Sequence, residues 1–231
     1  MSARHAPRLS IIVPALNEAA GIEACLLALA PLRQRGVEVI VADGGSSDAT
    51  AVLAAPLADQ VLASARGRAL QMQAGARAAR GAVLLFLHAD TLLPENADRL
   101  ILDGLAPGAH VWGRFDVRIS GRAPMLRVVG AFINLRSRLS GIATGDQAMF
   151  ATRAAYQDAG GFPAQPLMED IELSRRLKRL SSPLCLAARV TTSGRRWETN
   201  GLWRTILLMW RLRLQYWLGA SPELLAQRYR R

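Results

Sequence analysis

Short apolar runs alternate with longer amphipathic stretches along the first half of the chain. The runs that are typical of strands buried on both faces occupy residues 9–13, 37–42 and 83–87, and a further short strand is predicted at 61–63. Segments rich in Ala and Leu, which predict helices, lie between them at 21–32 and 69–79. Strands and helices that alternate at this spacing predict an α/β fold with a mostly parallel sheet flanked by helices.

The second half of the chain has a different pattern. Apolar and polar residues alternate over 111–119, which is typical of a strand with one buried and one exposed face. A periodic segment at 125–139 predicts an amphipathic helix with Arg127, Arg136 and Arg138 on its polar side. Further strands are predicted at about 147–151 and at 184–192, and further helices at 168–179 and 202–217.

Carboxylates follow three of the predicted strands. Glu18, Asp43 and Asp90 lie just beyond these strands, and the carboxyl ends of parallel strands share one edge of a sheet, so the three groups can converge on one cleft. Pro14-Ala-Leu-Asn-Glu18 replaces the GxGxxG of a dinucleotide fold, which indicates a nucleotide held by side chains. The alternative for Asp90 is an ordinary cap of the next turn.

Charge and composition narrow the class of protein. The 231 residues are 51% hydrophobic and 20% charged, without low-complexity tracts, which predicts one globular α/β domain. The net charge of +11 indicates an anionic partner, namely nucleic acid, a phosphorylated small molecule or a membrane surface. No recognised nucleic-acid module occurs, so no nucleic-acid partner is predicted.

Several features predict a cytoplasmic protein that is soluble or peripheral to a membrane. Residues 1–8 lack the apolar stretch of a signal peptide, and arginines interrupt the apolar segment near the C-terminus. Cys25 and Cys185 are far apart and predict two reduced thiols. In the helix at 202–217, tryptophans lie beside arginines, which suits the surface of an anionic membrane. Packing of this helix on its own domain or in a dimer is the open alternative, and the oligomeric state is not predicted.

Five blocks in order resemble the family 2 glycosyltransferases of GT-A fold over residues 9–197. They are Ser10-Ile-Ile-Val-Pro-Ala-Leu-Asn-Glu18, Val39-Ile-Val-Ala-Asp-Gly-Gly-Ser-Ser-Asp48, Leu85-Phe-Leu-His-Ala-Asp90, Gly160-Gly-Phe162 and Met168-Glu-Asp170. Each block alone is weak, but the ordered set is specific. Two further segments, Arg66-Gly-Arg-Ala-Leu-Gln-Met-Gln73 and Ser193-Gly-Arg-Arg-Trp197, resemble a small bacterial subgroup associated with radical-SAM gene neighbourhoods and arsenosugar synthesis.

This resemblance implies an inverting transfer of a sugar from a nucleotide-diphosphate sugar, with a UDP-sugar favoured, to an acceptor hydroxyl with the help of Mg²⁺ or Mn²⁺. It also implies a GT-A domain at 1–200, composed of a nucleotide-sugar half at 9–105 and an acceptor half at 106–200. An amphipathic basic helix and tail would then occupy 201–231.

The same resemblance assigns roles to residues. Asp170 matches the catalytic base, and Asp90 matches the metal-binding carboxylate of the DXD motif, in which His88 replaces the first acid and leaves one carboxylate. Asp43 would accept a hydrogen bond from a uracil-like ring nitrogen. The expected nucleotide-binding residues are Pro14, Ala15, Glu18, Asp43, Arg66, Arg68 and Ala89, the two arginines through charge-assisted contacts to phosphate.

The acceptor side is predicted more loosely. Asp146, Gln147 and Trp197 are candidates to line an acceptor pocket, and Glu169 next to Asp170 is expected to increase its basicity. Ordinary loop polarity and a packed indole explain the first three equally well. Two adjacent carboxylates at a helix start are also favoured by the helix dipole alone, so Glu169 and Asp170 have a purely structural alternative.

Two other functions fit parts of this pattern. A sugar-phosphate nucleotidyltransferase would share the α/β nucleotide fold and the metal, but it should have a Gly-rich, Arg-bearing loop after the first strand. A membrane-associated nucleotide-sugar binding protein without turnover is the non-enzymatic alternative, and His88 is the one feature that indicates it.

Overall fold

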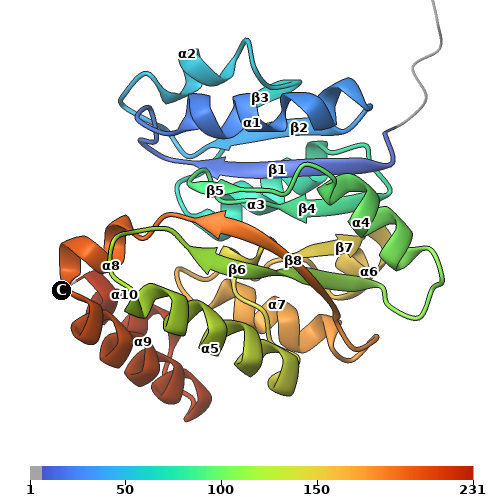
Figure 1. Ribbon diagram of the computed structural model, residues 1–231. Helices are drawn as coiled ribbons and strands as arrows, with labels where there is room; N and C mark the ends of the chain where they lie inside the picture. The colour runs from blue at the N-terminus through green and yellow to red at the C-terminus, as the bar shows by residue number, and fades with distance from the viewer. Residues whose placement is uncertain (1–6, 231) are drawn as a thin grey trace, which may run out of the picture.

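The computed structural model describes residues 7–230, which are built around an eight-stranded sheet (Figure 1). The strands are β1 (Leu9–Ala15), β2 (Glu38–Asp43), β3 (Gln60–Ala63), β4 (Val83–Phe86), β5 (Thr91–Leu92), β6 (Trp112–Ile119), β7 (Phe150–Thr152) and β8 (Leu184–Thr192). The helices are α1 (Ile22–Gln34), α2 (Thr50–Ala54), α3 (Arg68–Ala78), α4 (Ala97–Leu105), α5 (Met125–Ser140), α6 (Arg153–Asp158), α7 (Glu169–Leu177), α8 (Arg195–Asn200), α9 (Leu202–Trp217) and α10 (Pro222–Arg230), with a 3₁₀ turn η1 (Gly145–Gln147).

The strands lie in the order β3-β2-β1-β4-β7-β6-β8-β5. The first four are parallel, as predicted for alternating strands and helices. β7 runs antiparallel to β4 and β6, β6 and β8 are parallel to each other, and β5 is antiparallel to β8. The predicted α/β fold with a mostly parallel sheet flanked by helices is therefore confirmed.

Two apolar layers cover the faces of the sheet because successive side chains of a strand point to opposite sides. In β1, Ile11 packs with α1, α2 and α4, whereas Ile12 packs with α3, α6 and α7 on the other face. α5 lies on the side of α1 and α4 (Figure 1). A third, smaller cluster joins α9 and α10 to the segment that precedes α7, through Leu167, Met168 and Leu212.

Strand β1 extends two residues beyond the predicted end and includes Pro14. The carbonyl of Ile12 accepts a hydrogen bond from Leu87 beyond the end of β4, and residues two apart in a strand point to the same neighbour. The missing N–H of Pro14 therefore faces the side where β4 has ended, so no ladder hydrogen bond is lost there.

The prediction of a half-exposed strand at 111–119 is wrong, because β6 is buried on both faces. Arg114 is fully buried: it forms an ion pair with Asp116 and donates a hydrogen bond to Ser137 Oγ at 3.1 Å. Arg138 donates to the same carboxylate of Asp116 at 2.7 Å. Helix α5 thus covers the polar face of the strand, and ion pairing compensates the buried charge.

A second correction concerns the strand predicted at about 147–151. Gln147 ends the 3₁₀ turn η1, and the strand begins at Phe150. Thr144 and Gln147 form a capping box, and Ala148 then takes a left-handed backbone conformation with φ of 46°. This local hydrogen bonding competes with strand formation, and an apolar run alone does not reveal it.

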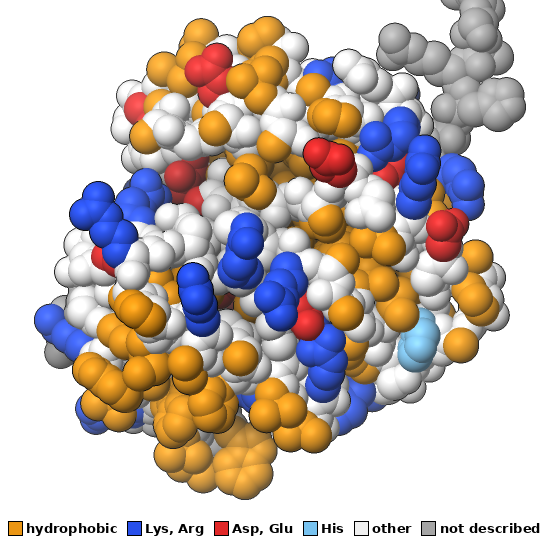
Figure 2. Space-filling view, in the orientation of Figure 1, with side chains coloured by type: hydrophobic (Ala, Val, Ile, Leu, Met, Phe, Trp, Pro, Cys, Tyr) orange, Lys and Arg blue, Asp and Glu red, His pale blue; other side chains and the backbone are white. Residues whose placement is uncertain are grey.

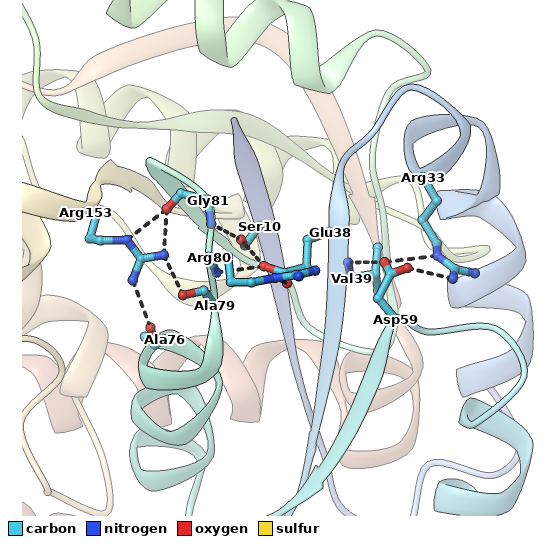
Figure 3. Close-up of polar contacts among 10 residues, drawn as sticks. All are labelled: Ser10, Arg33, Glu38, Val39, Asp59, Ala76, Ala79, Arg80, Gly81 and Arg153. Carbon is cyan, nitrogen blue, oxygen red and sulfur yellow. Dashed lines mark hydrogen bonds and ion pairs between the residues drawn. The ribbon is translucent and has the colours of Figure 1, made fainter. Parts of the chain in front are cut away.

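A polar network holds the amino ends of the central strands together (Figure 3). Glu38 accepts hydrogen bonds from Ser10 Oγ at 2.6 Å and from Arg80 Nε at 2.7 Å. Burial alone would raise the pKa of Glu38, but these bonds outweigh it and hold the pKa below its usual value. Arg153 donates to the carbonyl oxygens of Ala79 and Gly81 and so ties the end of α3 to the start of β4. The polar side chains at the amino ends of these strands thus stabilise the fold. A ligand site is expected at the carboxyl ends of the strands.

None of the helices in residues 7–230 combines the length and apolar character needed to cross a membrane. Residues 1–6, part of the segment on which the absence of a signal peptide was predicted, lie outside the described residues. The prediction of free thiols is confirmed: Cys25 is buried and Cys185 is half-buried. Burial raises the pKa of the Cys25 thiol to about 12, so this thiol is unreactive at neutral pH.

Candidate active site

Two cavities meet at the carboxyl edge of the sheet. We call the first the strand-end cavity; it has a volume of about 610 Å³ and is lined by Pro14, Leu16, Glu18, Arg68, Gln71, His88, Ala89, Asp90, Arg195 and Thr199. The second, the α7 cavity, has a volume of about 200 Å³; its lining includes Arg68, His88, Asp90, Gly145, Asp146, Asp170, Thr192, Ser193, Trp197, Met209, Arg213 and Tyr229. Arg68, His88 and Asp90 line both cavities, so a ligand in one can reach a ligand in the other.

Arg68 is held at the junction of the cavities by Glu169. Its Nε–H donates to Glu169 Oε1 at 2.5 Å, which joins the first turn of α3 to the first turn of α7. Glu169 is buried, whereas about two-fifths of the Arg68 side chain is exposed. Glu169 therefore directs a cationic side chain into the cavities and does not line them itself.

Glu18 and Asp90 make the strand-end cavity electronegative at one point. Burial and the nearby charge of Asp90 raise the pKa of Glu18 above its usual value. Arg195 lies 4.0 Å from Glu18, which is a weak ion pair. A cation close to both carboxylates would relieve their repulsion, because an opposite charge favours the ionised form.

The residues present fit a metal ion whose ligands are mostly water and phosphate oxygens, with few from the protein. Within residues 7–230 no group of three or more His, Cys, Asp or Glu side chains has the geometry to hold a metal. Mg²⁺ typically takes one or two protein carboxylates and completes its shell with water and phosphate oxygens. Asp90, with Glu18 nearby, matches such a site when a diphosphate occupies the cavity.

Asp170 is the second residue of α7 and faces the α7 cavity. Its Oδ2 accepts a hydrogen bond from the backbone N–H of Gly145 at 2.8 Å, and its Oδ1 accepts one from Ile171 N–H at 2.8 Å. Each carboxylate oxygen retains a further lone pair. Asp170 is thus oriented by two backbone donors and can still accept a proton.

His88, which lines both cavities, lies next to Asp146, which lines the α7 cavity. Nδ1 of His88 lies 3.5 Å from Oδ1 of Asp146. Burial would raise the pKa of Asp146, but its hydrogen bond and electrostatic attraction to His88 hold it below the usual value. A side chain at Gly145 would place its Cβ 2.5 Å from the His88 ring, so this glycine is required by the close approach of the ring.

The structure brings together most of the residues predicted for the site. The residues that line at least one of the two cavities are Pro14, Glu18, Arg68, Ala89, Asp90, Asp146, Asp170 and Trp197. Five others lie outside both linings: Ala15, Asp43, Arg66, Gln147 and Glu169.

Glu169 is buried in its contact with Arg68, and the positions of the other four have separate causes. Ala15 is buried in β1, and Arg66 is exposed. The carboxylate of Asp43 accepts hydrogen bonds from the backbone of Gly45 and Ser46, so it orders the loop after β2. Gln147 is fully buried and bonds to Thr144 and Asn134, which is a structural role.

Several lining residues from the C-terminal part of the chain were not predicted. Thr192 ends β8 and Ser193 follows it, Met209 and Arg213 belong to α9, and Tyr229 belongs to α10. Ser193 begins the segment Ser193-Gly-Arg-Arg-Trp197, and the resemblance of this segment to a bacterial subgroup could have indicated its role. The others look like ordinary helix or strand residues, and their part in the cavity depends on how α9 and α10 pack.

Comparison with known proteins identifies the family. The sequence profile of glycosyl transferase family 2 matches residues 10–158, and the chain belongs to this family. Among curated relatives, a PGL/p-HBAD biosynthesis glycosyltransferase of Mycobacterium bovis is 37% identical over 112 residues, which cover 46% of this chain and 43% of the relative. Succinoglycan biosynthesis protein ExoA of Rhizobium meliloti is 37% identical over 109 residues, 43% of this chain and 33% of that protein. The matches thus span less than half the length of these relatives.

Solved structures show the same fold. TarS 1-349 of S. aureus has a TM-score of 0.64 at 17% identity and covers 81% of this chain and 60% of that one. Mannosyltransferase PcManGT from Pyrobaculum calidifontis, in complex with GDP-Man and Mn²⁺, has a TM-score of 0.60 at 21% identity, with coverage of 81% and 57%. Glucosyl-3-phosphoglycerate synthase from Mycobacterium tuberculosis, in complex with Mn²⁺, UDP and glucosyl-3-phosphoglycerate, also has a TM-score of 0.60 at 21% identity, with coverage of 80% and 71%. The predicted GT-A type fold is confirmed.

Proposed function

We propose that this chain is an inverting glycosyltransferase that moves a sugar from a nucleotide-diphosphate sugar to an acceptor hydroxyl. The observation that carries the proposal is the junction of the two cavities at Arg68, His88 and Asp90, with Asp170 in the second cavity. A donor in the strand-end cavity would direct its diphosphate to this junction. Its sugar would then face the α7 cavity, where an acceptor can approach.

The donor is held by side chains of the strand ends. Pro14 and Glu18 line the cavity beside α3, and the loop ordered by Asp43 adjoins them. We favour a UDP-sugar on the resemblance of the first two sequence blocks. Proteins of the same fold bind donors with different bases, since TarS was solved with UDP-GlcNAc and PcManGT with GDP-Man.

Asp90 would bind a divalent cation on the diphosphate. When bound, Mg²⁺ or Mn²⁺ neutralises the charge that the leaving diphosphate gains. Arg68 adds a fixed positive charge from the protein at the same junction. Two structural relatives were crystallised with Mn²⁺, which supports this part of the proposal.

Asp170 acts as the general base. The acceptor oxygen forms a bond to the anomeric carbon while the bond from that carbon to the diphosphate oxygen breaks, and the electron pair leaves with the nucleoside diphosphate. The acceptor proton passes to the carboxylate of Asp170. Because attack comes from the face opposite the leaving group, the anomeric configuration inverts.

We also propose that the chain belongs to the small bacterial subgroup associated with arsenosugar synthesis, which the segments 66–73 and 193–197 resemble. Arg68 and Gln71, from the first of these segments, line the strand-end cavity. Ser193 and Trp197, from the second, line the α7 cavity. The first segment thus lines the cavity proposed for the donor, and the second lines the cavity proposed for the acceptor.

We also propose that one face of α9 contacts an anionic membrane surface. Trp203, Trp210 and Trp217 are each more than three-fifths exposed, and Arg204 and Arg211 on the same helix are exposed as well. Indoles beside guanidinium groups suit the headgroup region of such a membrane. The opposite face of α9 packs on the domain through Leu212, so one helix serves both contacts.

Substitution of Asp170 tests the proposed function. With Asp170→Asn we expect sugar transfer to fall by about 10² to 10⁴-fold, since a positioned general base contributes this much. Binding of the nucleotide should stay unchanged. Asp103→Asn, at an exposed position of α4, removes the same charge far from the cavities and serves as the matched control. Transfer that is unaffected by Asp170→Asn would contradict the proposal.

A further inference from the structure

A third hollow, the α5–α9 groove, lies between the two helices that give it this name. It has a volume of about 420 Å³, and its walls are mainly apolar, with Val129, Phe132 and Ile133 from α5 and Trp203, Ile206 and Trp210 from α9. Figure 2 shows hydrophobic side chains gathered over this part of the molecule. Phe132, Trp203 and Trp210 are each more than three-fifths exposed, so the apolar walls continue to the surface.

The groove opens into the α7 cavity. Asp146, Trp197, Met209 and Arg213 line both hollows. A ligand that fills the groove can therefore reach the cavity that holds Asp170 without leaving the protein.

Two arginines in the lining of the groove lack hydrogen-bond partners. Nε and Nη2 of Arg136, from α5, and Nε of Arg213, from α9, are buried and have no partner within the described part of the chain. Burial and the neighbouring Arg213 guanidinium lower the pKa of Arg136 to about 10, and burial lowers the pKa of Arg213. Both side chains are still charged at neutral pH, so two unsatisfied cations lie next to each other.

Neighbouring groups compensate this charge only in part. Asp146 and Asp170 attract both arginines, and Arg114 adds further repulsion at Arg136. Neither carboxylate forms a hydrogen bond with the arginine atoms that are buried without partners. An anion with several acceptor oxygens would satisfy those donors, because guanidinium groups bind phosphate and carboxylate through paired hydrogen bonds.

From this arrangement we infer that the acceptor is an amphiphile, with an aliphatic chain in the α5–α9 groove and an anionic group on Arg136 and Arg213. The inference rests on the proposed function, which assigns the α7 cavity to the acceptor. With its anionic group at the arginines, the ligand would bring an adjacent hydroxyl to the cavity of Asp170. Charge complementarity selects this occupant over a second copy of the chain, whose apolar contact would leave both cations unpaired.

The groove is tested by calorimetric titration of the whole chain with decyl phosphate, decanol and inorganic phosphate, each below its aggregation concentration. We expect decyl phosphate to bind at least about tenfold more tightly than either partial ligand, which corresponds to about 1.4 kcal/mol. Equal binding of decyl phosphate and decanol would overturn the anionic part of the inference. Equal binding of decyl phosphate and inorganic phosphate would overturn the aliphatic part.

Matched variants locate the binding. Arg213→Gln should weaken decyl phosphate by about tenfold or more and leave decanol unchanged, whereas Arg211→Gln, exposed on the same helix, should change neither. Ile206→Trp should fill the groove and weaken both ligands, whereas Leu207→Trp, which points to solvent, should not. Decyl phosphate binding that is insensitive to both Arg213→Gln and Ile206→Trp would overturn the inference.

Two parallel measurements separate the possible failures. Titration of the wild-type chain with nucleoside diphosphates reports on the strand-end cavity. Absence of nucleotide binding in a chain that still binds decyl phosphate would contradict the proposed function but not the assignment of the groove. Light scattering reports the oligomeric state. A dimer that Ile206→Trp disrupts, together with no binding of decyl phosphate, would assign the groove to a second copy and overturn the inference.

Discussion

Oδ2 of Asp170 accepts a hydrogen bond from the backbone N–H of Gly145 at 2.8 Å. This contact joins the start of α7 to the 3₁₀ turn η1, two segments that the sequence separates by 25 positions. The same turn approaches His88 so closely that a Cβ at Gly145 would lie 2.5 Å from the ring. The position of the proposed base and that of His88 are therefore coupled through one glycine.

Gly145→Ala is expected to slow sugar transfer by about ten- to hundredfold, because displacement of a reacting group by about 1 Å can cost this much. The added methyl group displaces either His88 or the amide that orients Asp170. Steady-state kinetics of the single variant and of Gly145→Ala combined with His88→Ala measure the effect. We expect the alanine to cost much less once the ring is absent, since residues in contact do not act additively. The same cost in both backgrounds would show that the clash with His88 is not the cause.

Removal of Arg68 should destabilise the fold through Glu169. Arg68→Gln leaves a buried carboxylate without its cation, and Oε2 of Glu169 already has no hydrogen-bond partner in the described chain. We expect a loss of about 1–3 kcal/mol in the free energy of unfolding, below the range for fully buried pairs because Arg68 is partly exposed. The double variant Arg68→Gln/Glu169→Gln should recover part of this loss, as measured by urea denaturation. Arg66→Gln, at an exposed position, is the control and should change stability by less than about 0.5 kcal/mol.

Glu38 should make stability depend on pH in the acid range. Its pKa is lower in the folded protein than in the unfolded chain, so its stabilisation is complete above about pH 4.5 and is lost as the pH falls through the folded value. Glu38→Gln should therefore cost about 1–3 kcal/mol at pH 7 and progressively less below pH 4.5. Urea denaturation between pH 7 and pH 3 measures the difference, with Glu95→Gln, at an exposed position, as control. A difference between wild type and Glu38→Gln that stays constant with pH would contradict this account.

Much of the fold follows from hydrophobic periodicity. The strand β8 and the helix α9 have the predicted bounds, and β1, β2 and β4 lie where short apolar runs indicate them. Burial of polar faces could not be predicted, because Arg114 becomes a core residue only when Asp116 and α5 supply its partners. The same limit explains the misplaced strand at Gln147, whose local capping box outweighs its apolar surroundings.

The candidate site was predictable where it depends on strand order. Glu18 and Asp90 were expected together because parallel strands end at one edge, and both line the strand-end cavity. Arg136 was placed on the polar side of its helix, yet it lines the groove beside Arg213. A helix pattern shows which residues share a face, but the packing of α9 against α5 decides what that face meets.

The exposed face of α9 predicts binding to anionic membranes. Sedimentation with liposomes that contain anionic lipid should carry the protein down, and added salt should release part of it, because the arginines contribute a screened attraction. Trp210→Ser combined with Trp217→Ser should weaken sedimentation, whereas Val52→Ser, an exposed apolar residue on α2, should not. Binding that ignores lipid charge and salt would remove the electrostatic part of the proposal.

The central claim is that Asp90 binds a cation on a nucleotide diphosphate in the strand-end cavity. The most direct test is thermal unfolding of wild type and Asp90→Ala with a panel of nucleoside diphosphates, with and without Mn²⁺. A ligand at about 100 times its dissociation constant adds about 2.7 kcal/mol of stability, so we expect one nucleotide to raise the Tm of wild type by about 5–10 °C in the presence of Mn²⁺. That shift should disappear in Asp90→Ala. No shift with any nucleotide, or an equal shift in Asp90→Ala, would contradict the account.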